Sequence, residues 1–221
     1  MINIAFYNKL KAELLTRNVE LVAVSKTKSI ADILELYNCG QKVFGENYVQ
    51  ELVEKQSQVP NDIQWHFIGH LQSNKVKYIA PFVSLIQSVD SLKLLKEINK
   101  EAKKNNRVIN CLLQIYIAKE ETKFGLSFEE AYVLLEEVKK NPLENICIKG
   151  MMAMASFSDE MMLINNEFKQ LKKFYEKVKV DKQLRQLDLQ ILCIGMSSDY
   201  KIAVDQGSDM VRIGSAIFGQ R

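Results

Sequence analysis

Apolar residues follow two kinds of spacing along this chain, and the two kinds alternate. Near the start an apolar residue recurs every three or four positions, which predicts a helix over residues 3–17. The next apolar run, 19–24, is short, continuous and rich in β-branched residues, as in a strand that is buried on both faces of a parallel sheet. A second helix is predicted over 30–38, with Ser29 as its N-cap. The chain therefore opens with a helix, a buried strand and another helix.

The same alternation continues to the end of the chain. Further strands are predicted near 42–45, 64–68, 83–89, 108–117, 146–151, 190–195 and 209–213. Helical patterns lie between them, most clearly at 92–104, 128–140 and 161–179, and most weakly at 73–79 and 199–206.

Together these patterns predict eight strands and eight helices. Strands that alternate with helices pair in parallel through right-handed crossovers. Eight such units favour an α/β fold with a closed (β/α)8 TIM barrel. A doubly wound open sheet is the alternative, because periodicity does not distinguish a closed sheet from an open one. No repeat, low-complexity segment or linker divides the chain, so we expect a single domain over residues 1–221.

The composition is that of a soluble globular protein, with 47% hydrophobic and 26% charged residues. The longest apolar runs are about 10 residues, whereas a membrane-spanning helix needs roughly 20. The net charge of +3 is too small to indicate nucleic-acid binding. We therefore expect neither a membrane nor a nucleic acid as a partner.

Cysteine spacing and the N-terminal segment bear on location. Cys39, Cys111, Cys147 and Cys193 are far apart in sequence, which predicts buried free thiols in a reducing compartment rather than disulfides or a metal site. The N-terminal segment lacks the pattern of a secretory signal peptide. We expect a cytoplasmic protein.

Candidate chemistry comes from the residues that follow each strand, because active sites of parallel barrels lie at the carboxyl ends of the strands. Lys26 leaves the first buried strand, and partial desolvation favours the neutral amine that forms a Schiff base. The alternative is a lysine that caps the strand in solvent. Asn47 follows the second strand; it could bind a ligand, but the residues alone favour an N-cap of the next helix.

The third and sixth strands offer weaker candidates. We expect His66 inside a strand and His70 in the loop after it, which is not the one-face helical pairing of zinc ligands. We expect no zinc, and His66 either faces a ligand or supports a residue that does. The methionines at 151–154 either fill the core, which is the commoner use, or form an apolar wall for a flat ring.

The last two strands carry the strongest candidates. Ser197 follows the seventh strand and the pair Gly214-Ser215 follows the eighth, the two places where barrels often bind phosphate through backbone N–H groups. Arg212 lies two residues before Gly214, so it should face the barrel interior at the same end. With Lys26, these residues predict a site for pyridoxal 5′-phosphate (PLP).

The chain also resembles a known family, the pyridoxal 5′-phosphate homeostasis proteins, over essentially its full length. The matching stretches are LVAVSKTKS (21–29), FGENYVQE (44–51), WHFIGHLQSNK (65–75), IQSVDS (86–91), KFGL (123–126), IKGMM (148–152) and LCIGMSSDYKIAVDQGSDMVRIGSAIFG (192–219). Several long motifs in the same order are far more specific than a single glycine pattern.

The resemblance implies a barrel like the N-terminal domain of alanine racemase, with PLP bound as a Schiff base to Lys26. It implies that Asn47 lies beside the ring and Arg212 beside the pyridine nitrogen. The full set of cofactor-binding residues that it implies is Lys26, Asn47, His66, Met196, Ser197, Arg212, Gly214 and Ser215. In that set, the serines and the glycine bind the phosphate, and His66 lies near the site.

The function implied by the resemblance is to bind, buffer and deliver PLP, without strong catalytic turnover. We expect a monomer, because the sequence shows no long exposed apolar stripe. PLP-dependent apo-enzymes are the expected recipients. Two physical arguments favour weak turnover. A cation beside the pyridine nitrogen disfavours protonation of that nitrogen, because like charges repel. Loss of one of the two proton-transfer groups that racemisation needs costs on the order of 10²–10⁴ in rate. The alternatives are a weak PLP-dependent amino-acid racemase of fold type III, and a barrel that binds another phosphorylated metabolite.

Overall fold

The computed structural model describes residues 2–119, 124–181, 184 and 187–219. Within these ranges, eight parallel strands pair in chain order and close into a barrel. The strands are β1 (Glu20–Val24), β2 (Val43–Glu46), β3 (Gln64–Phe67), β4 (Leu85–Val89), β5 (Ile109–Tyr116), β6 (Ile146–Met154), β7 (Ile191–Cys193) and β8 (Met210–Ile213). Because β8 pairs with β1 as well as with β7, the sheet is closed, and the (β/α)8 barrel is confirmed over the open sheet.

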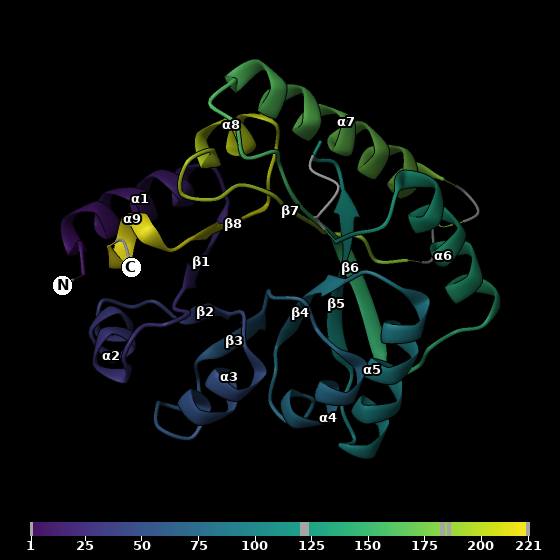
Figure 1. The fold of residues 1–221 in the computed structure, drawn as a ribbon, viewed down its shortest axis with the longest axis horizontal. Coiled ribbons are helices and arrows are strands. Elements are labelled where there is room, and N and C mark those ends of the chain that lie inside the picture. The colour runs from purple at the N-terminus through teal and green to yellow at the C-terminus, as the bar shows by residue number, and fades with distance from the viewer. Residues whose placement is uncertain (1, 120–123, 182–183, 185–186, 220–221) are drawn as a thin grey trace.

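Helices surround the strands in chain order, as Figure 1 shows. They are α1 (Ile4–Thr16), α2 (Ile30–Asn38), α3 (Val49–Gln56), the short 3-10 helix η1 (Ser73–Lys75), α4 (Val76–Ile79), α5 (Leu92–Lys104), α6 (Phe128–Lys140), α7 (Met161–Val180), α8 (Tyr200–Asp205) and α9 (Ser215–Phe218). In the part of the chain that the structure describes, no helix has both the length and the apolar character needed to cross a membrane.

The observed elements differ from the predicted ones mainly at short segments. The described residues form nine α-helices rather than eight, because α9 follows β8 directly. The helix expected at 73–79 is divided into η1 and α4. A segment of four residues is about one helical turn, which is too short for a spacing pattern to show.

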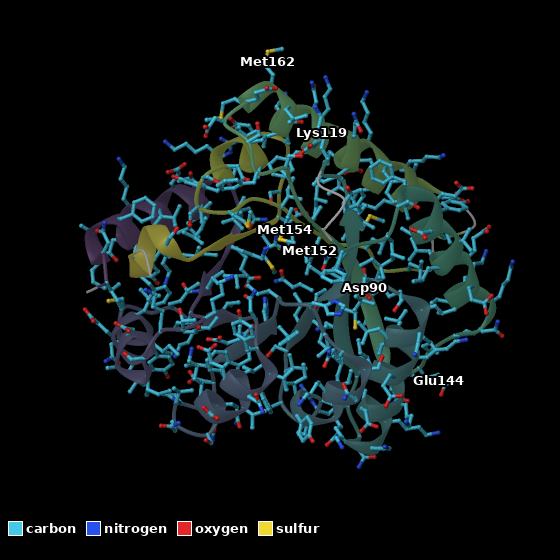
Figure 2. The ribbon with its side chains drawn as sticks, viewed as in Figure 1. Asp90, Lys119, Glu144, Met152, Met154 and Met162 are labelled. Atoms are coloured by element: carbon cyan, nitrogen blue, oxygen red, sulfur yellow. The ribbon has the colours of Figure 1, made fainter. Side chains whose placement is uncertain are left out.

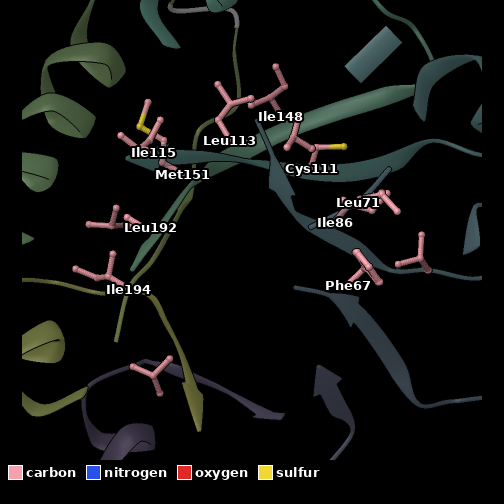
Figure 3. Packing of buried hydrophobic residues seen from close by; sticks show 14 of the residues in the cluster. Phe67, Leu71, Ile86, Cys111, Leu113, Ile115, Ile148, Met151, Leu192 and Ile194 are labelled. Atoms are coloured by element: carbon pink, nitrogen blue, oxygen red, sulfur yellow. The ribbon is translucent and has the colours of Figure 1, made fainter. Parts of the chain in front are cut away.

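The core has two layers. The larger one lies between the strands and the helices, and Figure 3 shows part of it, with Phe67, Ile86, Leu113, Met151 and Leu192 on the successive strands β3 to β7. A smaller cluster fills the barrel with one buried residue from each of seven strands: Val22, Val43, Leu85, Leu112, Met152, Cys193 and Met210. The first layer attaches the helices to the barrel, and the second makes the barrel interior a packed core.

Strand alternation determines which polar residues share the barrel interior. Val22 and Val43 belong to the inner cluster, so a period of two residues carries Lys26 and Asn47 to the same side just beyond the strands. By the same rule, Arg212 faces inward, two residues after Met210. The carboxyl end of the barrel thus gathers these three side chains.

The four cysteines are free, as expected, but not all are buried. Cys111 and Cys193 are buried, whereas Cys39 and Cys147 are half-buried. Cys39 ends α2 as its C-cap, and Cys147 lies on β6, where its neighbours Ile146 and Ile148 are buried. The expectation of four buried thiols was wrong for these two.

Candidate functional site

A cavity of about 450 Å³ opens at the carboxyl ends of the strands. Its lining comprises Val24, Lys26, Thr27, Lys28, Asn47, Ile68, Met154, Phe157, Met196, Ser197, Ser198, Arg212, Gly214, Ser215 and Gly219. Seven of the eight residues predicted from the sequence are therefore brought together here, and His66 is not among them. A larger hollow of about 620 Å³, lined by residues of α6 and α7, contains none of the eight.

Lys26 is presented by a tight turn at the end of β1. The Lys28 N–H donates to the Ser25 carbonyl at 3.0 Å, which closes the turn around Lys26 and Thr27. Thr27 has a φ of 63°, in the left-handed region that β-branched residues rarely adopt. Its N–H donates to Glu51 Oε1 at 2.5 Å. The side chain of Lys26 is half-buried at the corner of this turn and lines the cavity.

Asn47 does not cap α3, so that interpretation was wrong. The chain stays extended through Tyr48, which is the N-cap residue and makes no side-chain cap bond. Asn47 instead lines the cavity, and its buried Oδ1 has no hydrogen-bond partner among the described residues. A Cβ at Gly69 would overlap the Asn47 carbonyl, so only glycine permits this approach. Leaving a buried acceptor unpaired costs about 1–3 kcal/mol, so this oxygen suits a ligand that carries a donor.

Arg212 forms part of the cavity wall as a buried cation. Only 4% of its surface is exposed, and its guanidinium donates to the carbonyl of Ala153 at 3.0 Å and to Gln87 Oε1 at 3.4 Å. A weaker bond reaches Cys193 Sγ at 3.7 Å. Burial raises the pKa of Cys193 to about 11, so this thiol stays neutral. All these partners are uncharged, and a buried cation that has only neutral partners among the described residues favours an electron-rich acceptor in the cavity.

His66 lies behind the cavity wall, inside the barrel. Its Nδ1 accepts from Gln87 Nε2 at 3.1 Å, while Gln87 Oε1 accepts from Arg212. Burial lowers the pKa of His66 to about 3, so the imidazole is neutral. Among the described residues, hydrogen bonds connect His66 to the cavity wall through Gln87 and Arg212. Gln87 was missed, although it lies within the IQSVDS motif, which carried the resemblance but no assigned role.

The loops after β7 and β8 meet at one end of the cavity. The Gly214 N–H donates to Ser197 Oγ at 3.3 Å, which joins the two loops. Gly195 has a φ of 99°, and a Cβ there would lie 2.6 Å from the Cβ of Ala203, so glycine is required where the chain leaves β7. The N–H groups of a first helical turn have no acceptor within the helix, so Ser215 offers its N–H and its hydroxyl to an anion.

Apolar side chains form another part of the wall, and the methionines of β6 divide between the two uses expected for them. Met152 fills the barrel interior, as a core methionine should. Met154 lies two residues further along β6 and lines the cavity beside Met196, so it is not simply core. Figure 2 shows Met152 and Met154 near the centre of the ring of helices. Phe157, which is 96% exposed, also lines the cavity.

Lys28 and Lys123 also belong to the matching motifs, and their positions differ from that of Lys26. Lys28 lines the cavity, but its Nζ donates to the carbonyls of Phe218 at 3.1 Å and Gly219 at 3.3 Å. Lys123, in the KFGL motif, lies outside the described residues.

Comparisons with known proteins agree with this geometry. The family model of the alanine racemase N-terminal domain matches residues 6–221. A pyridoxal phosphate homeostasis protein of Haemophilus influenzae is 41% identical over 207 residues, which cover 92% of this chain and 85% of the relative. The human protein of the same name is 38% identical over 213 residues, covering 91% of this chain and 76% of the relative.

Solved structures extend the comparison. PipY of Synechococcus elongatus, solved with PLP bound, has a TM-score of 0.88 and 32% identity, and the match covers 97% of this chain and 99% of PipY. An alanine racemase of Clostridium difficile has a TM-score of 0.76 at 18% identity, covering 98% of this chain and 56% of the racemase, which shows a shared fold alone. The chain belongs to the pyridoxal phosphate homeostasis protein family.

Proposed function

We propose that this chain binds PLP in the cavity at the carboxyl ends of the strands and that it buffers and delivers the cofactor. The observation that carries the proposal is that one cavity joins a lysine, a buried guanidinium with neutral partners, and the two loops after β7 and β8. Its volume of about 450 Å³ is within the usual range for small-molecule sites. Bound PLP would supply an aldehyde carbon to which the Lys26 amine adds, with loss of water, to form a Schiff base.

The polar lining residues that the sequence singled out have distinct roles in this proposal. Ser197, Gly214 and Ser215 bind the phosphate through hydroxyl and N–H groups. Arg212 donates to the pyridine nitrogen, while Asn47 Oδ1 accepts from a donor beside the ring. Met154 and Met196 would supply apolar contacts to the ring.

The chain acts, in this proposal, without strong catalytic turnover. Arg212 keeps the pyridine nitrogen unprotonated, because two adjacent cations repel, and this weakens withdrawal of electrons into the ring. Among the described residues that line the cavity, there is no carboxylate, imidazole or phenol to serve as a second proton-transfer group. Loss of one such group costs about 10²–10⁴ in rate.

We also propose that the chain is a cytoplasmic monomer that passes PLP to PLP-dependent apo-enzymes. Exposed large apolar residues on different elements of the described chain support a monomer. Examples are Leu15 of α1, Tyr78 of α4 and Val133 of α6.

Titration of the purified protein with PLP tests the proposed function. We expect the visible absorbance of the Schiff base in the wild type, and its loss in Lys26→Ala. The matched control is Lys100→Ala, which removes an exposed lysine of α5 that pairs with Glu97 at 3.0 Å, and it should bind as the wild type does. Undiminished absorbance in Lys26→Ala would contradict the role of Lys26.

The racemase alternative is tested on the same samples. Deuterium exchange at the α-carbon of L-alanine should be negligible in the presence of PLP. Exchange or inversion at ordinary enzyme rates, about 1–10³ per second, would overturn the proposal of a carrier.

A further inference from the structure

A buried charged cluster lies behind the turn that carries Lys26, outside the cavity. Glu46 of β2 is completely buried, and Lys55 of α3 has only 7% of its side chain exposed. Lys55 Nζ donates to Glu46 Oε1 at 2.8 Å and to Glu51 Oε1 at 2.6 Å. Glu46 and Glu51 belong to the FGENYVQE motif, and the proposed function gives neither of them a role. We call Glu46, Glu51 and Lys55 the clamp.

The clamp contacts the chain on both sides of Lys26. Ser25, immediately before it, donates its hydroxyl to Glu46 Oε1 at 2.6 Å and receives a bond from Lys55 Nζ on its carbonyl at 2.7 Å. Thr27, immediately after it, donates its N–H to Glu51 Oε1 at 2.5 Å. Lys55 is not part of the cavity lining, and its bond to the Ser25 carbonyl connects it to the turn that carries Lys26.

A buried ion pair of this kind is weak evidence for a contribution to stability. Desolvation of two charges roughly cancels their attraction, and apolar residues of similar size often stabilise a fold as well or better. Burial raises the pKa of Glu46, whereas the hydrogen bonds from Lys55 and Ser25 act to lower it. The second oxygen of Glu46 has no hydrogen-bond partner among the described residues, so the pair is not even fully satisfied.

The turn, for its part, needs support. Thr27 adopts a left-handed φ of 63°, which a β-branched residue keeps only when its surroundings hold it there. The Thr27 N–H bond to Glu51 and the Lys55 bond to the Ser25 carbonyl supply that support from α3. Both bonds therefore bear on the backbone conformation of the turn that carries Lys26.

We propose that Lys55 is a positioning residue which, with Glu46 and Glu51, holds the Lys26 turn so that the amine meets the aldehyde carbon of PLP. This inference rests on the proposed function. It predicts that the clamp affects Schiff-base formation and leaves phosphate and ring binding unchanged, because the latter depend on the loops after β7 and β8.

Two ligands separate these effects: PLP, and pyridoxine 5′-phosphate, which has an alcohol in place of the aldehyde and forms no Schiff base. We compare Glu51→Ala and the double variant Glu46→Gln/Lys55→Met with the wild type. The matched control is Glu97→Ala, which breaks the exposed Lys100–Glu97 pair of α5. We expect both clamp variants to bind PLP about tenfold more weakly and pyridoxine 5′-phosphate within about twofold of the wild type. Amide hydrogen exchange at Thr27 should be faster in Glu51→Ala.

The outcomes are distinct. Equal losses for both ligands would mean general loss of structure and would overturn the positioning role. Unchanged PLP binding in both variants would overturn it as well. If the wild type binds neither ligand, the proposed function fails and the clamp has no reaction to serve. If the wild type binds PLP but the clamp variants do not show the selective loss of PLP binding, this inference fails and the proposed function stands.

Discussion

His66 is a histidine held neutral inside the barrel. Burial lowers its pKa to about 3, and its Nδ1 accepts from Gln87 at 3.1 Å. A protonated imidazole would turn that acceptor into a donor and would place a second cation near the buried guanidinium of Arg212. The unfolded chain does not impose this constraint, so His66 takes up a proton more readily when the protein unfolds.

This difference predicts acid sensitivity of the free energy of unfolding. The folded pKa is below the unfolded value of about 6.5, so the stability that neutral His66 contributes is complete above that pH and is lost as the pH falls toward 3. The expected contribution of His66 is about 1.4 kcal/mol for each pH unit in this window. Chemical denaturation at pH 7 and pH 5 measures it.

The control for this experiment is a variant that changes no titrating group. Ser57→Ala, at an exposed hydroxyl that donates to the Glu54 carbonyl, should keep the acid sensitivity of the wild type. His66→Gln should reduce it. The same loss of stability between pH 7 and pH 5 in His66→Gln and in the wild type would contradict the assignment.

At the scale of elements, α2 begins directly after the Lys26 turn, with a reciprocal cap. The Ser29 hydroxyl accepts from the Asp32 N–H at 3.1 Å, and Asp32 accepts from the Ser29 N–H at 3.0 Å. Such a cap fixes where the helix starts and satisfies two N–H groups that have no partner inside the helix.

Ser29→Ala should lower the free energy of unfolding by about 1 kcal/mol, because it removes the acceptor for the first turn of α2. Chemical denaturation at neutral pH provides the measurement. Ser57→Ala is the matched control, since the exposed Ser57 hydroxyl only donates to the Glu54 carbonyl at the end of α3. A change in Ser29→Ala no larger than that in Ser57→Ala would show that the cap contributes nothing to stability.

The elements also show why sequence patterns predicted some features and not others. Long strands and helices have enough residues to display their period, and Ser29 was predicted correctly as a cap. The residues alone favoured Asn47 as an N-cap, which was wrong, because one side chain type serves both capping and ligand binding. The resemblance placed Asn47 at the cofactor site, and Asn47 does line the cavity. His66 pairs with Gln87, 21 residues away, and no local pattern reveals such a contact.

At the scale of the whole molecule, closure of the barrel creates the site. Lys26 lies near one end of the sequence and Ser215 near the other, and β1 pairs with β8, which brings their loops to the same cavity. Close to this seam, the Asn3 N–H of the N-terminal segment donates to the Ile217 carbonyl of α9 at 2.8 Å. The single-domain organisation and the monomeric state of the chain both remain predictions.

The most direct test of the central claim is borohydride reduction of the protein after PLP is added, followed by peptide mass mapping. Reduction converts a Schiff base into a stable amine and so records which lysine carried the cofactor. We expect the pyridoxyl mass on the peptide that contains Lys26 and the loss of visible absorbance. A protein that stays colourless and unmodified, or the label on another lysine such as Lys28, would contradict the account.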